Sequence, residues 1–133
     1  MKKVTGFGGI FFKSNAPKDL MAWYDKHLGL QSDDWGGKAW EWREKDDAET
    51  VGQTVFNPFK PDSKKFAPSE LPYMFNFRVH DLDALMAQLK SEGVQVVGDV
   101  QDTEYGKFGW IMDPDGRKIE LWQAPAADPS AGK

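Results

Sequence analysis

The sequence contains no cysteine and only two histidines among its 133 residues. The absence of cysteine excludes a disulfide framework, a thiolate metal site and a cysteine nucleophile. No apolar stretch reaches the length of a transmembrane helix, and residues 1–6 lack the apolar run of a signal peptide. We therefore expect a soluble cytoplasmic protein with no membrane partner.

Positive charge is also sparse. Lysine and arginine number 17 against 21 aspartate and glutamate residues, which gives a formal net charge of -4 and an isoelectric point near 5.1. The basic residues are scattered, with only short pairs such as Lys64 and Lys65. A surface that neutralises nucleic-acid phosphates needs concentrated lysine and arginine, so we expect no nucleic-acid partner.

What the chain does contain is apolar and aromatic side chains, at 40% and 14% of its residues. A chain of this length and composition can bury one core, and we expect one domain over residues 1–123. The segment 124–133 carries prolines and small residues, and we expect a disordered tail there. Aromatic richness is typical of a large core or of an aromatic-lined pocket, and composition does not separate the two.

The predicted elements occur in the order strand, helix and several strands, and this order occurs twice. The predicted strands are 4–13, short strands around 40–43, then 50–56, 73–79, 94–97, 108–112 and 118–122. The predicted helices are 17–27, ended by Gly29, and 82–91, capped by Asp81 and closed by Gly93. In the first helix, the 3.6-residue period predicts a buried stripe of Leu20, Trp23, Tyr24 and His27.

Short identities accompany this repeated order. Leu20-Met21-Ala22 recurs sixty-five residues later as Leu85-Met86-Ala87, and the same offset relates Phe12-Lys13 to Phe77-Arg78. One half alone would leave a face of its sheet exposed, so two packed copies explain the length better than one irregular domain. We expect module one over 4–57, a connector over 58–71 and module two over 72–123. Whether residues 57–71 form a lid is left open.

The last predicted hairpin carries the first candidate for chemistry. A turn at Asp113-Pro114-Asp115-Gly116 joins two strands, because proline presets φ and glycine accepts a positive φ. On the second strand, the period-2 rule places Lys118, Glu120 and Trp122 on one face. Glu120 is thus a carboxylate in an otherwise apolar hairpin. An isolated strand glutamate usually faces water, so the rest of the chain has to support a functional role.

Three stretches resemble the vicinal oxygen chelate superfamily, which includes glyoxalase I, bleomycin-resistance proteins and extradiol dioxygenases. They are Ala22-Trp23-Tyr24-Asp25-Lys26-His27-Leu28-Gly29-Leu30, Phe77-Arg78-Val79-His80-Asp81-Leu82-Asp83-Ala84-Leu85, and the hairpin from Trp110 to Trp122. The resemblance covers roughly Phe7 to Trp122. It implies an α+β fold of two βαβββ modules packed as one domain, with a curved mixed sheet that encloses a cleft. It also implies a small-molecule ligand and a homodimer.

The resemblance also gives positions for metal ligands, which come from the first and last strands of each module. Glu120 matches the last-strand glutamate of the second module. The first-strand positions, where the family usually has His or Gln and then His, fall on Gly9 and Met74. The remaining position falls on or near Thr54, or on Gln53 in another register. Glycine offers no donor and a thioether suits Cu(I) rather than hard cations, so only one strong ligand is left. We expect no cofactor, with a divalent metal as the alternative.

Neither histidine is expected to complete such a site. His27 lies in the last turn of its predicted helix, where a protonated imidazole interacts favourably with the helix dipole. His80 directly precedes the capping Asp81, at the rim of the predicted sheet.

The first functional hypothesis is a metal-free small-molecule binder of the bleomycin-resistance or drug-sequestering kind. Strand parity predicts one cleft lined by Phe7, Gly9, Phe11, Trp40, Trp42, Met74, Asn76, Trp110 and Glu120, and the resemblance adds Thr54 to this set. Glu120 would then pair with a cationic ligand group or have a raised pKa, because an unpaired buried carboxylate prefers the neutral form. For any single aromatic residue, ordinary core packing is the simpler interpretation.

Two other hypotheses remain open. A lyase, isomerase or dioxygenase of the glyoxalase kind would use a divalent metal to polarise vicinal substrate oxygens, with Glu120 as ligand or general base. That activity requires an unusual ligand set, with Gln53, Glu41 or Glu49 contributed by other strands. The third hypothesis is a dimeric regulatory or scaffold module whose cleft is filled by side chains.

Overall fold

The computed structural model describes residues 3–125, which contain two helices and seven strands. In chain order these are β1 (Val4–Lys13), α1 (Pro17–Leu28), β2 (Lys38–Glu44), β3 (Asp47–Phe59), β4 (Tyr73–Val79), α2 (Leu82–Ser91), β5 (Gln101–Thr103), β6 (Gly106–Met112) and β7 (Lys118–Gln123). Within residues 3–125, no helix is long and apolar enough to cross a membrane. The tail predicted over 124–133 falls outside the described residues from Ala126 onward.

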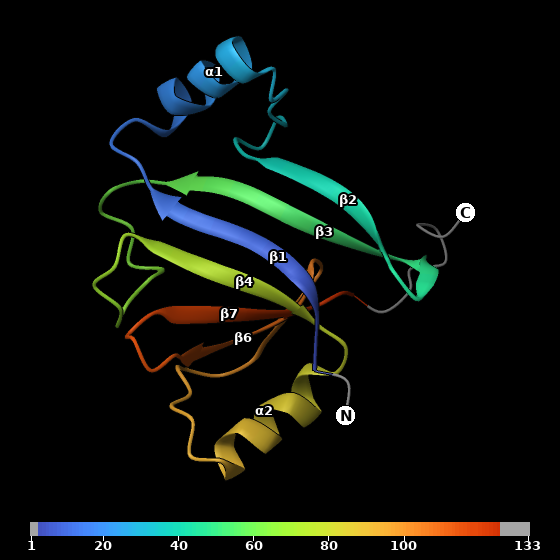
Figure 1. Cartoon of the computed structure of the whole chain (residues 1–133). Helices are drawn as coiled ribbons and strands as arrows, with labels where there is room; N and C mark the ends of the chain where they lie inside the picture. Colours follow the sequence, from blue (N-terminus) through green and yellow to red (C-terminus); the bar gives the residue numbers. More distant parts are fainter. Residues whose placement is uncertain (1–2, 126–133) are drawn as a thin grey trace.

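All strands belong to one curved sheet, in the order β2-β3-β1-β4-β7-β6-β5 (Figure 1). The first strands of the two halves, β1 and β4, pair antiparallel at its centre. In each half the last strand returns parallel to the first, so β3 lies beside β1 and β7 lies beside β4. The repeated arrangement predicted from the short identities is therefore present in the sheet. The α+β fold with a curved mixed sheet is confirmed.

The two modules differ in their strand content. Three strands follow α2, whereas two strands follow α1 in the described chain, so the first module departs from the βαβββ pattern. The segment of the first module that corresponds to β5 lies before β2 and forms a turn. Asp33 N donates to the carbonyl of Gly37 at 2.7 Å, and Ala39 N donates to the Asp33 carboxylate at 2.9 Å. In the second module, the strand predicted at 94–97 is reduced to one bridge, Val96 to Ile111, and β5 lies a few residues later.

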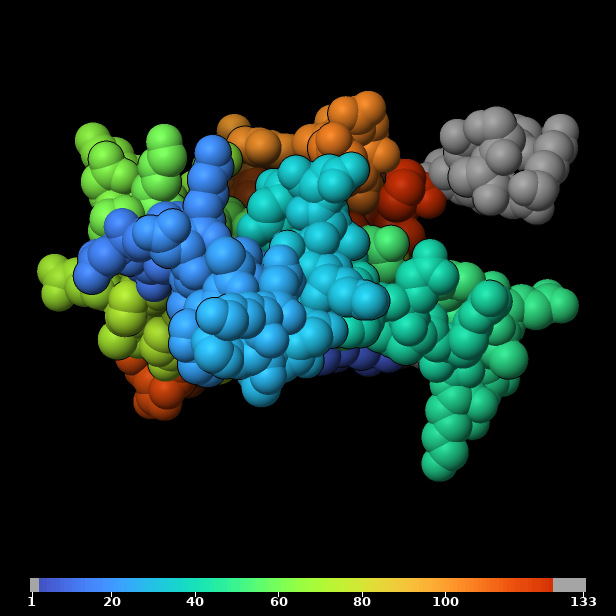
Figure 2. Space-filling view, turned by 90° about the horizontal axis from the view of Figure 1, so that it is seen from above, coloured from blue at the N-terminus to red at the C-terminus, as the bar shows by residue number. Residues whose placement is uncertain are grey.

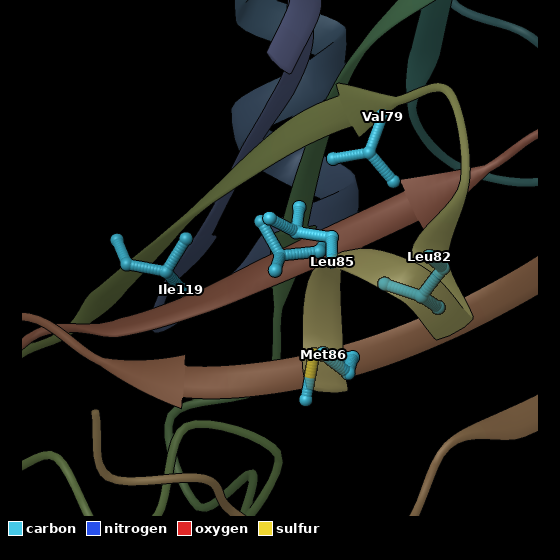
Figure 3. Packing of buried hydrophobic residues seen from close by; sticks show 6 residues of the cluster. Val79, Leu82, Leu85, Met86 and Ile119 are labelled. Carbon is cyan, nitrogen blue, oxygen red and sulfur yellow. The ribbon is translucent and has the colours of Figure 1, made fainter. Parts of the chain in front are cut away.

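Helix α2 contributes the buried core of the second module (Figure 3). Its Asp81 cap accepts a hydrogen bond from Ala84 N at 3.2 Å, as the sequence predicts. One face of the helix packs on β6 and β7, which removes apolar surface from water. The cluster consists of Val79, Leu82, Leu85, Met86, Ile119 and Leu121.

Helix α1 packs less deeply, and the predicted stripe on it is largely wrong. Its one buried residue is Met21, the counterpart of Met86 in the repeat. Tyr24 meets Phe56 at a ring distance of 5.2 Å, but Trp23 is 52% exposed, and its ring meets those of Tyr24 and His27 in the same helix. Helix α1 touches the sheet chiefly through β3, near one corner, so only a narrow line of its surface is covered.

Strand β1 changes its side-chain parity part of the way along. A register shift against β4 lies between Phe7 and Gly9, and Gly9 has a φ of +137°. The extra residue of a bulge reverses which face the following side chains occupy. Phe7 consequently packs edge-on against Phe75 and Phe77, on the face that carries the helices. Phe11, four residues later, lies on the opposite face.

The connector predicted over 58–71 begins later than expected, because β3 continues to Phe59. Residues 60–72 then cross to β4. Phe66, at the middle of this loop, is buried and stacks on Phe59 with a ring distance of 5.4 Å. The loop is thus anchored by its own aromatic residue.

Candidate functional site

The face of the sheet opposite the helices carries the polar residues of β4 and β7. Phe75 and Phe77 on β4 pack toward α2, so the alternate residues Met74, Asn76 and Arg78 face the other way. On the neighbouring strand, Ile119 and Leu121 likewise belong to the α2 core, and Lys118, Glu120 and Trp122 face the other way. This face is the concave candidate for a ligand site.

A cavity of about 420 Å³ opens on this face. Both modules and the loop before β5 contribute to its walls, and in Figure 2 the loop 60–72 (green) and the segment near β5 (orange) project from the same side of the molecule. Its lining residues are Phe11, Phe59, Lys65, Met74, Val97, Gly98, Asp99, Gln101, Trp110, Lys118 and Glu120.

Glu120 is held in the cavity wall by two donors. The register of the sheet sets it between Asn76 on β4 and Trp110 on β6. Asn76 Nδ2 donates to Glu120 Oε1 at 2.6 Å, and Trp110 Nε1 donates to Glu120 Oε2 at 2.8 Å. The residue is only 9% exposed, and burial raises the pKa of its carboxyl although both hydrogen bonds and the Lys118 charge act in the opposite direction. The water-facing interpretation of Glu120 is excluded.

Asn76 is fully buried beside Gly8 of β1. A Cβ atom at position 8 would collide with the Asn76 amide oxygen, so glycine is required there for the amide to reach Glu120. That amide oxygen has no hydrogen-bond partner among residues 3–125. The close approach of β1 therefore positions the Asn76 donor.

Lys118 adds a cation to the same wall. Its Nζ donates to the carbonyl of Lys65 at 2.8 Å and lies 5.5 Å from the centroid of the Trp110 ring. Burial lowers the pKa of Lys118, while the nearby Glu120 opposes that shift. The Trp110 ring that would attract a ligand cation is therefore already covered by a protein cation.

The structure brings together five of the residues predicted for the cleft, Phe11, Met74, Asn76, Trp110 and Glu120. Phe7 lies on the helix side of the sheet because of the bulge.

The other predicted residues lie away from this cavity. Gly9 faces the backbone of β3 at Val55, where a side chain has no room. Trp42 donates to Thr54 Oγ1 at 2.9 Å, and both lie on the module-one half of the sheet. Trp40, two residues before Trp42, is 43% exposed.

These residues do not fit a divalent metal. Both Glu120 oxygens already accept hydrogen bonds, and Thr54 Oγ1 donates to the carbonyl of Phe7 at 2.6 Å. Glu41 pairs with Gln53 across β2 and β3, and both alternate with the cleft-side residues, so neither reaches Glu120. Within the described chain, no three His, Cys, Asp or Glu side chains form a group that could hold a metal ion.

Sequence reasoning overlooked several residues of the cavity. Lys118 could have been found, because the period-2 rule already placed it beside Glu120. Lys65 and Phe59 come from the connector and the extended end of β3, residues 97–99 come from the loop before β5, and Gln101 is the first residue of β5. No local sequence pattern marks these positions, because only the folded chain brings them to the wall.

Comparison with known proteins agrees with this architecture. The family model described as Glyoxalase/Bleomycin resistance protein/Dioxygenase superfamily matches residues 13–121. No curated protein matches the sequence.

Solved structures of similar fold cover almost the whole chain. Methylmalonyl-CoA epimerase from Mycobacterium tuberculosis is 25% identical, with a TM-score of 0.61, over 96% of this chain and 93% of that one. A methylmalonyl-CoA epimerase in complex with methylmalonyl-CoA and NH4+ is 16% identical, with a TM-score of 0.67, over 94% and 98%. A catechol 2,3-dioxygenase is 20% identical, with a TM-score of 0.52, over 98% of this chain and 42% of that one.

Proposed function

Because this chain belongs to the Glyoxalase/Bleomycin resistance protein/Dioxygenase superfamily, we propose that it binds a small molecule in the cavity at Glu120 without a complete metal site. The observation that carries the proposal is the state of Glu120 itself. It is buried in the wall of an open cavity of about 420 Å³, and both of its oxygens are engaged by protein donors. An open cavity with converging polar groups also counts against the scaffold hypothesis of a filled cleft.

The charges at the cavity favour a ligand with an acceptor oxygen over a cationic ligand. Two lysines, Lys118 and Lys65, and two acids, Asp99 and Glu120, line the wall. Both Glu120 oxygens already accept hydrogen bonds from the protein, whereas Lys118 lies over the Trp110 ring with donor capacity left for a ligand. A ligand cation would be repelled by both lysines, whereas a carbonyl or carboxylate oxygen gains a charged donor. The similar fold of an epimerase solved with methylmalonyl-CoA is in keeping with such a ligand. This replaces the cationic ligand considered from the sequence.

The first test asks whether the chain binds a divalent metal. We would measure the metal content of the purified chain and its melting temperature with added Mg²⁺, Mn²⁺, Ni²⁺ or Zn²⁺, with Glu120→Gln as the matched control. A metal that binds the folded state alone raises the melting temperature as its concentration rises. We expect no stoichiometric metal and no shift that depends on Glu120. Stoichiometric metal with a Glu120-dependent shift would instead support the glyoxalase-type lyase, isomerase or dioxygenase.

Ligand binding is tested second, with a panel of small carbonyl and carboxylate compounds followed by the Trp110 indole signal in NMR spectra. Lys118→Gln removes the charged donor and should weaken binding about tenfold or more, because hydrogen bonds to charged groups contribute about 1.5–3 kcal/mol. Lys64→Gln is the control, since Lys64 is exposed and is not part of the wall. Equal binding by wild type and Lys118→Gln would contradict the proposed preference for a ligand with an acceptor oxygen.

We also propose an oligomeric state, a domain extent and a cellular location. We infer a homodimer from the exposed apolar side chains on and after α1, which include Trp23, Leu28 and Trp35. We also infer one domain over residues 1–123 and a cytoplasmic location. These inferences are independent of the ligand.

A further inference from the structure

A second cavity, of about 220 Å³, lies on the same face of the sheet, around Arg78. Arg78 follows Asn76 by two positions on β4 and pairs with Gly6 of β1 and with Trp122 of β7. The cavity is also lined by Thr5, Trp42, Glu44, Thr50 and Gln123. It shares no lining residue with the cavity at Glu120.

Arg78 is the unusual residue of this cavity. It is only 7% exposed, and its guanidinium carbon lies 4.2 Å from the centroid of the Trp122 ring. Among residues 3–125, no hydrogen bond or ion pair of its guanidinium group is found. Burial lowers the pKa of Arg78, but a guanidinium stays charged in proteins. Among residues 3–125 the Asn76 amide oxygen is the one fully buried side-chain polar atom without a partner, so the guanidinium nitrogens of Arg78 are reached from the cavity that they line, and an anion there would give them charge-assisted hydrogen bonds.

The surroundings hold this cation in a fixed orientation. Trp122 stacks on Phe108 at a ring distance of 5.7 Å and donates through Nε1 to the carbonyl of Tyr105 at 2.8 Å. The ring therefore covers one face of the guanidinium and is itself immobilised. The planar fork of arginine matches a carboxylate through two parallel hydrogen bonds when its edge is accessible.

The opposite wall is flat and aromatic. A Cβ atom at Gly6 or Gly52 would collide with the ring of Trp42, so these glycines allow the ring to lie against the sheet. The indole nitrogen is used on Thr54. Trp42 thus offers the cavity an apolar surface, suited to the hydrocarbon part of a small acid.

Glu44 determines which anion fits. Its charge raises the pKa of Arg78, so it lies within electrostatic reach, yet it forms no ion pair with Arg78 in the described structure. A singly charged carboxylate meets less repulsion from Glu44 than a phosphate, which carries more charge. The small volume also excludes a large ligand.

We propose that the cavity around Arg78 binds the carboxylate of a small organic acid, with Arg78 as the bidentate partner and Trp42 against the hydrocarbon part. The site stands on its own residues, whether or not the cavity at Glu120 takes a ligand.

The test is a titration of the full chain with propionate, and separately with inorganic phosphate, at constant ionic strength. NMR spectra follow the indole signals of Trp42 and Trp122, with Trp110 reporting the other cavity. We expect saturable shifts with propionate at Trp42 and Trp122 and weaker binding of phosphate. Arg78→Lys keeps the charge but loses the fork, and should raise the dissociation constant about tenfold.

Glu44→Gln is the second variant, and it remains informative if Arg78→Lys fails to fold. Removing the competing charge should tighten propionate binding several-fold, which a purely structural role of Arg78 does not predict. Lys118→Gln should leave propionate binding at Trp122 unchanged. The proposal is overturned by an absence of saturable shifts at Trp42 and Trp122, by equal affinity in Arg78→Lys, by no tightening in Glu44→Gln, or by tighter binding of phosphate than of propionate.

Discussion

Glu120 shows how one side chain couples the candidate site to stability. Burial raises the pKa of this carboxyl above its ordinary value of 4.5. The folded state then binds more protons than the unfolded chain between pH 4.5 and the raised pKa. Because stability falls with pH wherever the folded state holds more protons, the free energy of unfolding should fall as pH rises through this window.

The matching prediction concerns Glu120→Gln. The amide does not titrate, so the variant should lose less stability than wild type as pH rises from 4.5 through the raised pKa. Urea unfolding at a series of pH values measures this difference. Glu70→Gln, at an exposed position, is the control and should follow wild type. Parallel curves for wild type and Glu120→Gln would show that the carboxyl has the same pKa in both states.

Gly8 provides a second prediction for single residues. In Gly8→Ala, the new methyl group collides with the Asn76 amide oxygen and pushes the amide away from Glu120. We expect a loss of about 1–3 kcal/mol in the free energy of unfolding, as is typical of overpacking. The measurement is urea unfolding.

The double variant Gly8→Ala with Asn76→Ala separates this contact from other effects. If the clash is the cause, Gly8→Ala should cost much less when Asn76 is already alanine, and the two changes will not add. Additive costs would place the strain elsewhere on β1.

At the level of elements, the two helices have different depths of burial, although the sequence relates them by a repeat. Leu82 of α2 is 0% exposed, whereas Leu28 of α1 is 66% exposed. Leu82→Ala should therefore cost about 2–5 kcal/mol of unfolding free energy through lost burial and a cavity. Leu28→Ala, the same substitution, should change it by less than about 0.5 kcal/mol when both variants are measured at a protein concentration at which the proposed dimer is dissociated. Similar costs for the two variants under that condition would contradict the shallow packing of α1.

The regularity of each strand explains which parts of the site could be predicted from the sequence. The strand β7 and its turn follow from local chemistry, so Glu120 and its face were correctly derived from period-2 alternation. On β1 the same rule failed, because a bulge at Gly8 and Gly9 moved Phe7 to the helix side. A bulge depends on the partner strand, which a single strand's sequence does not reveal.

For the whole molecule, the proposed homodimer predicts a melting temperature that rises with protein concentration, because association stabilises the folded state by mass action. Trp23 is 52% exposed on α1 and Tyr105 is 67% exposed at the turn before β6. Trp23→Glu should abolish the concentration dependence and give a monomer in sedimentation equilibrium. Tyr105→Glu is the matched control and should remain dimeric. A monomeric wild type would contradict the proposal.

The sequence by itself determined the repeated order of elements, the superfamily and the identity of Glu120 as the central carboxylate. These features rest on local periodicity, turn residues and short motifs, which are readable along the chain. Only the tertiary structure determined which residues line the two cavities. It also determined that Lys118 lies over the Trp110 ring and that Arg78 lies against the Trp122 ring. These features bring together residues from strands that are far apart in sequence. The contacts and charges around them depend on sheet register and burial, which exist only once the chain is folded.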